Sequence, residues 1–479
     1  SKMSNIVDFY KDRTLFITGV TGFMGKVLLE KLLRSCPGLK KVYLLMRPKK
    51  GHDIRTRLNQ LIESKLFDDI RENMLNVHEK VIPVAGDIME PKLGLSEEEE
   101  KILIEEVSIV FHSAATVRFD EPLKMSVQLN IIGVNRILDL CKKMQHLDAL
   151  IHISTAYANC DRHLISEKIY QPPITASKIV SAMEWMDDEV VQALTPKIIQ
   201  PRPNTYTFTK AIAEHLIAEK SENLPVAIVR PSIVGASWQE PLQGWVDNFN
   251  GPSGLLVAIG KGILRVMMGN NSACADLVPV DMAVNLIIAS AWSTATYGHN
   301  GLQIFNCTTG LQNRLTWGQI EKASMDCFSR NPVDVPVRLP NPKFTLNRTY
   351  YLLQRWFDHF LPAWFMDIGL KLCGQKPILM RLQRRLWKSV SCMEFFTSHE
   401  WKFEDDNVRK LYANMSERDQ KDFNFDVKQI HWPTYLENYC LGVKRFVLKE
   451  DMKNLLKARK AFYRLVGWLA GWLAGWLIG

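Results

Sequence analysis

The sequence predicts an α/β fold, a doubly wound parallel sheet, followed by a mostly helical C-terminal domain and an apolar tail. Two observations lead to this prediction. Roughly the first 240 residues alternate short Val/Ile/Leu-rich runs with amphipathic stretches, whereas residues 344–460 are rich in aromatic residues and helical in pattern. Continuous apolar runs separated by helices are typical of parallel strands that are covered on both faces.

Six apolar runs give the expected strands, each four to seven residues long. They are found within RTLFITG, KKVYLLMR, EKVIPVAGD, VSIVFHSAA, LDALIHIST and PVAIVRPSIVG. The stretch GKVLLEKLLRS follows the first run with helical periodicity. Further along, LVPVDMAVNLIIASAW is interpreted as a short strand that runs into a helix.

The pattern loosens between about 240 and 340, and its character changes after Pro340. We therefore expect three consecutive segments. Residues 1–340 form the sheet domain, with a distinct segment from about 235. Residues 341–460 form the helical domain, and residues 461–479 form the tail.

Composition excludes several classes of protein. The 479-residue chain is 47% hydrophobic and carries a net charge of +9, but no basic run interleaved with aromatic residues suggests a nucleic-acid groove. Its nine cysteines are scattered, which favours a reducing compartment and argues against a disulfide scaffold or a metal site. Cys160 is expected to be a packed thiol rather than a nucleophile. No apolar leader is expected at the N-terminus.

The tail, LVGWLAGWLAGWLIG, is a repeat of Gly, Trp, Leu and Ala. Its 15 uncharged residues fall short of the ~20 that a helix needs to cross a bilayer. Tryptophan favours the membrane interface, and a basic run from Lys449 to Arg464 precedes the repeat. A membrane-surface anchor is expected. An engineered replacement for a longer tail and a packed terminal helix stay open as alternatives.

A glycine motif joins the first run to the first helix. Gly19, Gly22 and Gly25 lie in the pattern Thr-Gly-x-x-Gly-x-x-Gly. In a Rossmann fold these glycines allow the tight turn, the approach of a pyrophosphate and close packing of helix on sheet. The alternative is a glycine-rich turn without a ligand. The motif makes seven residues candidates for cofactor binding: Thr18, Gly19, Thr21, Gly22, Phe23, Met24 and Gly25.

The ends of the next strands indicate which dinucleotide binds. Arg47 ends the second strand, where an acidic residue would favour NAD, so a 2′-phosphate and hence NADPH are expected. Lys49 and Lys50 lie close by, and a solvated basic turn is the alternative. Asp87 could reach the adenine or cap a helix. Ala114, at the end of the fourth strand, leaves room for a cofactor.

A candidate catalytic set follows the fifth strand. Ser154 and Thr155 lie at its carboxyl end, where open α/β sheets bind ligands. Tyr206 and Lys210 are four residues apart, on one face of an expected helix. Alone, such a pair is more often an ordinary surface feature. Pro231 ends the sixth strand beside the expected nicotinamide.

These motifs, in this order, resemble the extended short-chain dehydrogenase/reductases. Within that superfamily the chain is similar to the fatty acyl-CoA reductases, and in appearance to the vertebrate peroxisomal enzymes. The similarity covers roughly residues 5–455. It rests on FHSAATVRFDE, HISTAYANC, RPNTYTFTKA, VRPSIVGASWQEP, GWVDNFNGPSG, FFTSHEW and YLENYCLGVKRFVLKED.

The resemblance implies that Tyr206 donates a proton, that Lys210 lowers the pKa of that phenol and holds the nicotinamide ribose, and that Thr155, or less favourably Ser154, binds the substrate oxygen. It implies an NADPH-dependent reduction of long-chain acyl-CoA through an aldehyde to the primary alcohol, with release of CoA, feeding wax and ether lipid synthesis. The implied location is the peroxisomal membrane with the catalytic domain facing the cytosol, or else the endoplasmic reticulum. A homodimer is one alternative for its assembly.

Two other functions compete with this interpretation. Another extended reductase would act on a carrier-bound acyl group, a sugar nucleotide or a steroid. A non-catalytic dinucleotide-binding scaffold would not need both Tyr206 and Lys210, which are present.

Overall fold

The computed structural model describes residues 5–48, 51, 53–74, 76–297, 301–334, 336–451 and 459–460. The predicted tail, residues 461–479, lies outside the described residues, as do Lys49 and Lys50. The chain forms two compact units. The first comprises Ser1–Val234, Val278–Leu311 and Trp401–Val427, and the second comprises Gly235–Leu277, Gln312–Glu400 and Lys428–Gly479.

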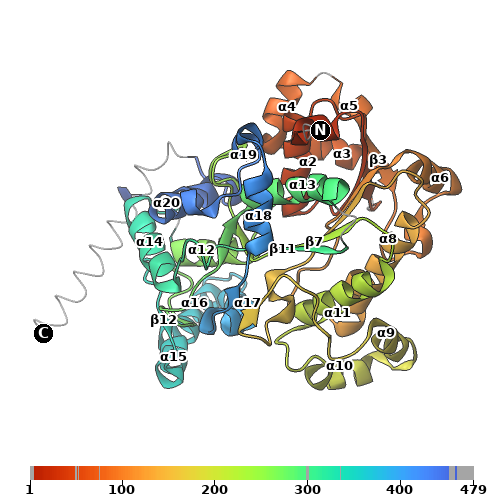
Figure 1. The fold of residues 1–479 in the computed structure, drawn as a ribbon. Helices are drawn as coiled ribbons and strands as arrows, with labels where there is room; N and C mark the ends of the chain where they lie inside the picture. The colour runs from red at the N-terminus through yellow and green to blue at the C-terminus, as the bar shows by residue number, and fades with distance from the viewer. Residues whose placement is uncertain are drawn as a thin grey trace, which may run out of the picture. The chain divides into compact units, whose positions relative to one another are not determined.

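The first unit is built on a seven-stranded sheet in the order β11-β7-β5-β4-β1-β2-β3. All neighbouring strands are parallel, so the predicted doubly wound sheet is confirmed (Figure 1). The strands are β1 (Thr14–Thr18), β2 (Lys41–Met46), β3 (Val81–Ala85), β4 (Ile109–His112), β5 (Ala149–Ile153), β7 (Val226–Pro231) and β11 (Gln303–Cys307). Six of them match the predicted runs. The seventh, β11, was not predicted because its sequence, QIFNC, has only two aliphatic or aromatic residues.

Helices cover both faces of this sheet. On one face α2 (Phe23–Ser35) packs against α13 (Val280–Tyr297), and on the other α8 (Gly133–Cys141) packs against α11 (Thr205–Lys220), as Figure 1 shows. The remaining helices of this unit are α1 (Ile6–Tyr10), α3 (Ile54–Ile62), α4 (Asp68–Asn73), α5 (Val77–Lys80), α6 (Glu97–Glu106), α7 (Leu123–Val127), α9 (Ala176–Trp185), α10 (Asp188–Ile198), α18 (Asp406–Asn414) and α19 (Glu417–Asp422). Because the sheet is covered, every residue of β1, β4, β5 and β7 is buried.

The second unit is mostly helical. Its helices are α12 (Pro252–Gly260), α14 (Trp317–Arg330), α15 (Arg348–Gln354), α16 (Leu361–Leu372), α17 (Leu379–Ser398) and α20 (Trp432–Gly442). One small parallel pair joins β9 (Met267–Met268) to β12 (Phe344–Thr345). In the part of the chain that the structure describes, no helix has the length and apolar character needed to cross a membrane.

The two units do not follow the linear boundary expected near Pro340. Residues 401–427 were expected in the helical domain, but they form α18 and α19 of the first unit. Asp419 accepts a hydrogen bond from the Ile6 N–H (3.1 Å), and the Lys31 ammonium donates to the Asp422 carbonyl (2.6 Å). The helical pattern of the C-terminal region predicts secondary structure but not the unit against which each helix packs.

Candidate active site

The turn between β1 and α2 has the geometry of a phosphate cradle. Gly19 has φ +76°, and a Cβ there would lie 2.6 Å from the Ala114 backbone nitrogen. A Cβ on Gly25 would lie 2.3 Å from the Gly19 carbonyl oxygen, so the helix packs on the turn only without a side chain. Gly22 is the N-cap of α2 and, having no side chain, offers no cap of its own to the N–H groups at the start of that helix. These donors suit the pyrophosphate of a dinucleotide, so the residues present fit such a cofactor.

The other motif residues have different surroundings. Thr18 is fully buried. Its hydroxyl accepts a hydrogen bond from the Ala114 N–H (3.2 Å) and lies 2.8 Å from Nδ1 of His112. Thr18 therefore ties the end of β1 to the end of β4. Thr21 is exposed, whereas Phe23 and Met24 are half-buried at the start of α2.

Arg47 and Asp87 meet at the ends of β2 and β3. The Arg47 guanidinium lies 3.7 Å from the Asp87 carboxylate, and its side chain is 66% exposed. Asp87 also accepts a hydrogen bond from the Met89 N–H (3.0 Å), so the carboxylate stabilises a local turn rather than the helix cap considered from the sequence. An exposed guanidinium at this strand end can bind an additional anion.

Tyr206 and Lys210 lie on α11, beside the end of β5. Asn204 begins the helix by accepting a hydrogen bond from the Thr207 N–H, and this cap places Tyr206 in the first turn. The Lys210 ammonium donates to the Ile153 carbonyl at 2.7 Å, and the Tyr206 phenol lies close enough to the Thr155 hydroxyl for that group to lower its pKa. The structure thus brings together the three side chains that the sequence singled out.

The geometry distinguishes Thr155 from Ser154. The Thr155 hydroxyl lies beside the Tyr206 phenol. It also lies 3.5 Å from the Pro231 carbonyl, at the end of β7. The Ser154 hydroxyl is buried without a hydrogen-bond partner among the described residues, while its N–H donates to the Val229 carbonyl (2.8 Å). Thr155 is therefore the better placed of the two to share a substrate oxygen with Tyr206.

Burial controls the protonation of this pair. It raises the pKa of Tyr206 to about 12, although the hydrogen bond from Thr155 opposes the shift. Burial also lowers the pKa of Lys210 to about 8, and the negative charge of Glu214 opposes that shift. From its place one turn away, the Lys210 ammonium was expected to lower the phenol pKa. In the protein alone this pKa is instead raised by desolvation, and Lys210 is not among the groups that shift it.

A buried ion pair next to the site was missed in the sequence. Glu214 lies one turn beyond Lys210 and accepts two hydrogen bonds from Arg230, at 2.9 and 2.7 Å. Both side chains are almost completely buried. The available signal was Arg230 itself, a cation at the end of an apolar strand run immediately before Pro231, because a buried cation needs a partner.

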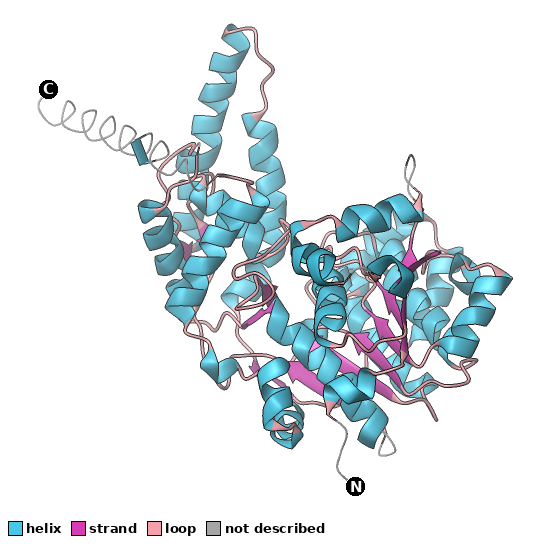
Figure 2. Cartoon of the chain, turned by 90° about the horizontal axis from the view of Figure 1, so that it is seen from above, coloured by secondary structure: helices cyan, strands magenta, loops and turns pink. Residues whose placement is uncertain are grey.

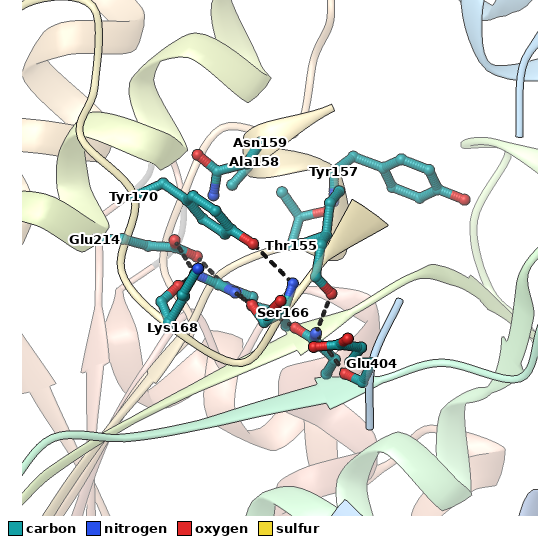
Figure 3. Close-up of polar contacts among 12 residues, drawn as sticks. Thr155, Tyr157, Ala158, Asn159, Ser166, Lys168, Tyr170, Glu214 and Glu404 are labelled. Atoms are coloured by element: carbon teal, nitrogen blue, oxygen red, sulfur yellow. Dashed lines mark hydrogen bonds and ion pairs between the residues drawn. The ribbon is translucent and has the colours of Figure 1, made fainter. Parts of the chain in front are cut away.

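Arg230 also organises the loop that follows the catalytic strand. It donates to the carbonyl oxygens of Ser166 (3.1 Å) and Lys168 (2.9 Å), while the Tyr170 hydroxyl accepts from the Ser166 N–H (2.8 Å). Figure 3 shows Ser166, Lys168 and Tyr170 of this loop together with Glu214. The loop carbonyls and the side-chain oxygen of Asn306 on β11, which accepts at 3.5 Å, thereby satisfy the remaining guanidinium donors. Cys160, near its start, is buried with its pKa raised to about 12, which confirms the prediction of a packed thiol.

Two buried histidines lie beneath the site. His112 and His152 are register partners on β4 and β5, with ring centroids 5.3 Å apart. Burial lowers the pKa of His112 to about 3 and that of His152 well below its usual value, and the Lys210 charge adds to both shifts. Neutral imidazoles therefore support the strand ends at neutral pH.

Together, the parallel sheet, the glycine turn and the Tyr–Lys pair define an extended short-chain dehydrogenase/reductase. Solved structures agree with this fold. The reductase domain of a nonribosomal peptide synthetase from Mycobacterium tuberculosis has a TM-score of 0.61 and 18% identity, covering 91% of this chain and 93% of that one. A UDP-glucuronic acid 4-epimerase from Bacillus cereus, solved with NAD, has a TM-score of 0.52 and 14% identity, covering 90% of this chain and 99% of that one.

Sequence comparison identifies the family. Two models described as male sterility protein match residues 17–287, through an NAD-binding region, and residues 358–450. Fatty acyl-CoA reductase 1 of Xenopus laevis is 46% identical over 463 residues, which cover 97% of this chain and 90% of that protein. The chain belongs to the fatty acyl-CoA reductase family, as the resemblance of its motifs indicated.

Replacing Glu214 with Gln should destabilise the first unit. The substitution keeps the shape but leaves the Arg230 charge buried without its counter-ion, a loss that typically costs about 3–5 kcal/mol. Chemical denaturation followed by circular dichroism should show the shift. As a control, Glu219→Gln changes a more exposed carboxylate on the same helix and should alter stability by less than about 0.5 kcal/mol. Equal midpoints for the two variants would contradict the role of the pair.

The two histidines should make the protein acid-sensitive. A histidine that is neutral when buried gains its proton on unfolding, so stability present above pH 6.5 is lost as the pH falls towards 3. Each such group adds a slope of about 1.4 kcal/mol per pH unit. His112→Asn, which can keep an acceptor for Thr18, should flatten the dependence of unfolding free energy on pH between 6 and 4. The exposed control His146→Asn should not.

Proposed function

We propose that this chain reduces long-chain fatty acyl-CoA to the primary alcohol, with NADPH as reductant and release of CoA. The proposal rests on one observation. The side chains of Thr155, Tyr206 and Lys210 lie together at the end of β5. The relatives named fatty acyl-CoA reductase support the choice of substrate. The candidate catalytic residues are Tyr206, Lys210 and Thr155, with Ser154 in a lesser role.

NADPH, when bound, supplies the hydride that attacks the carbonyl carbon. Thr155 and Tyr206 would hold the carbonyl oxygen between their hydroxyl groups, where negative charge develops. A phenol with a pKa of about 12 is fully protonated at neutral pH, so Tyr206 carries its proton before the reaction begins. The developing alkoxide is the stronger base and can take that proton. Lys210, with a pKa of about 8, remains mostly protonated near pH 7 and supports the negative charge.

The reduction needs two hydride transfers at the same oxygen-binding groups. The first converts the thioester to a hemithioacetal. Its hydroxyl loses a proton as the C–S bond breaks, which gives an aldehyde and a CoA thiolate, and the thiolate takes up that proton to form the CoA thiol. The second converts the aldehyde to the alcohol. In balance, one acyl-CoA, two NADPH and two protons give one alcohol, one CoA and two NADP⁺. Buried Cys160 supplies no nucleophile, because its thiol stays protonated.

The proposed cofactor residues follow the sequence motifs. The α2 N–H groups and the glycine turn would hold the pyrophosphate, and Arg47 would hold the 2′-phosphate. Lys210 would bond the nicotinamide ribose, and Ala114 and Pro231 would border the nicotinamide half. Asp87, already turned towards Arg47, would bond the adenine.

Membrane attachment through residues 461–479, a peroxisomal location with the catalytic unit facing the cytosol, and a contribution to wax and ether lipid synthesis also belong to this proposal. They are supported by the basic run and the apolar tail of the sequence. An endoplasmic reticulum location is the alternative.

Purified protein should oxidise NADPH in the presence of acyl-CoA and form alcohol. A panel of acyl-CoAs of different chain length, with product analysis for aldehyde and alcohol, measures this. Tyr206→Phe removes the proton donor and should reduce kcat by about 10²-fold or more while NADPH still binds. Tyr412→Phe, on α18 of the same unit, is the matched control and should remain active.

The panel also tests the competing functions. Oxidation with a carrier-bound acyl thioester but with no acyl-CoA would favour a carrier-dependent reductase. Turnover of a sugar nucleotide or steroid alone would favour those classes. NADPH binding without any turnover would indicate a scaffold. Each of these results would refute the proposed function.

Arg47→Glu should distinguish the two dinucleotides. Charge reversal removes the partner of the 2′-phosphate, so the Kd for NADPH should rise at least tenfold more than that for NADH, a difference of about 1.4 kcal/mol. Fluorescence titration of both cofactors measures it. Arg71→Glu makes the same change of charge on α4 and should leave the ratio unchanged. Equal weakening of both cofactors by Arg47→Glu would rule out the 2′-phosphate role.

A further inference from the structure

Helices α16 and α17 form a hairpin, and one carboxylate on α16 fixes the start of α17. The two helices pack against each other and are joined by residues 373–378. Asp367 on α16 accepts hydrogen bonds from the N–H groups of Ile378, Leu379 and Met380 at 2.9–3.0 Å, so it caps the start of α17. At the top of Figure 2 the hairpin stands out from the rest of its unit.

The outward side of α16 is apolar. Its buried positions are Ala363 and Asp367, whereas five large apolar side chains on one face are exposed. These are Leu361, Trp364, Phe365, Ile368 and Leu372, spaced i, i+3, i+4, i+7 and i+11. Phe365 is 59% exposed and Leu372 is 84% exposed. A helix at the surface of a soluble protein normally directs such an apolar stripe towards the core. On α16 the stripe faces outwards instead.

The apolar surface continues into the preceding helical turns. Trp356 and Phe357, in the π-helical segment Arg355–Phe360, are 63% and 64% exposed. On the packed side of the same segment, His359 contacts Trp387 of α17, with ring centroids 5.5 Å apart. The exposed aromatics are therefore not frayed core residues, because the core side of this segment is already filled. An exposed cluster of this kind marks an interaction site.

The charge around this surface is strongly positive. Residues 346–388 contain eight Lys and Arg but only two acidic residues, both Asp. Asp367 is used in the cap, and Asp358 lies 3.7 Å from Arg265. Arg384 and Arg385 are exposed on α17, and neither has an ion pair within the described part of the chain. The apolar stripe thus comes with cations that are free to meet an anionic surface.

The hairpin is too short and too charged to cross a bilayer. Twelve residues of α16 extend about 18 Å, against a hydrocarbon core of about 30 Å. Asp367 and Lys371 within the helix would also be costly at the centre of a membrane. Aromatic and leucine side chains beside Arg and Lys are instead typical of elements that lie in the membrane interface.

We propose that the α15–α17 segment is a membrane-binding element, which inserts the α16 stripe into the interface of a bilayer with anionic lipid headgroups. This surface is separate from the C-terminal tail, and the proposal does not depend on the reductase activity. A protein partner is disfavoured because Lys and Arg outnumber the acids fourfold in residues 346–388 beside the apolar stripe, which suits a fluid anionic surface. A second copy of this chain would bring the same positive charge to the interface.

A probe at the hairpin tip separates this element from the tail. Cys373 directly follows α16 and is the one exposed cysteine of the nine, the others being buried or half-buried. An environment-sensitive fluorophore on Cys373 of the full chain should shift to the blue with vesicles of phosphatidylcholine and phosphatidylserine. A lipid-borne quencher should quench it. The control carries the label at Glu98→Cys on α6, an exposed acidic position, in a Cys373→Ser background, and should not respond.

Two variants test the two forces separately. Trp364→Ser with Phe365→Ser should abolish the shift at Cys373 without changing NADPH binding. Arg384→Glu with Arg385→Glu should weaken vesicle affinity at least fivefold per charge, and this loss should disappear at high salt. Vesicle binding with an unshifted Cys373 probe would mean that only the tail attaches, and would overturn the proposal. So would a shift that occurs without lipid as the protein dimerises.

Discussion

The ion pair between Glu214 and Arg230 is the constraint on which the site depends. It joins α11, which carries Tyr206 and Lys210, to β7, whose last residue is Pro231. A guanidinium without exposure to water is tolerated only when its charge and its donors are all satisfied. Here the carboxylate takes two donors, and the loop carbonyls of Ser166 and Lys168 take others. Folding of the loop, the helix and the strand is therefore coupled around one charge.

The same burial that fixes the geometry also sets the chemistry. Lys210 shares a helix face with Glu214, and that charge limits how far desolvation can lower the ammonium pKa. Desolvation and the negative charge of Glu214 both raise the phenol pKa of Tyr206, and the opposing effect of Thr155 is smaller. The phenol therefore keeps its proton until negative charge develops on a substrate oxygen. The neutral histidines below add no competing positive charge.

Much of this arrangement could be predicted from the sequence. Apolar runs give six of the seven strands, and the glycine spacing gives the cradle, because backbone geometry at such a turn excludes a Cβ. The Tyr206–Lys210 spacing gives a shared face. Strand β11 could not be predicted, because its polar Asn306 is satisfied only by partners distant in sequence, the carbonyls of Ile165 and Glu404. The phenol pKa could not be predicted either, because it depends on burial rather than on spacing.

Residues 401–427 belong to the first unit although they are synthesised long after its sheet, and this affects how the unit folds during synthesis. Glu167 accepts hydrogen bonds from the N–H groups of Asn306 and Asn407, and Trp401 donates its indole N–H to the Cys160 carbonyl (3.0 Å). A ribosome adding 5–20 residues per second needs roughly 10–40 s to go from the end of β7 to α19. Throughout that interval the nascent sheet domain lacks residues 401–427. A chain truncated before residue 401 would lack these contacts permanently.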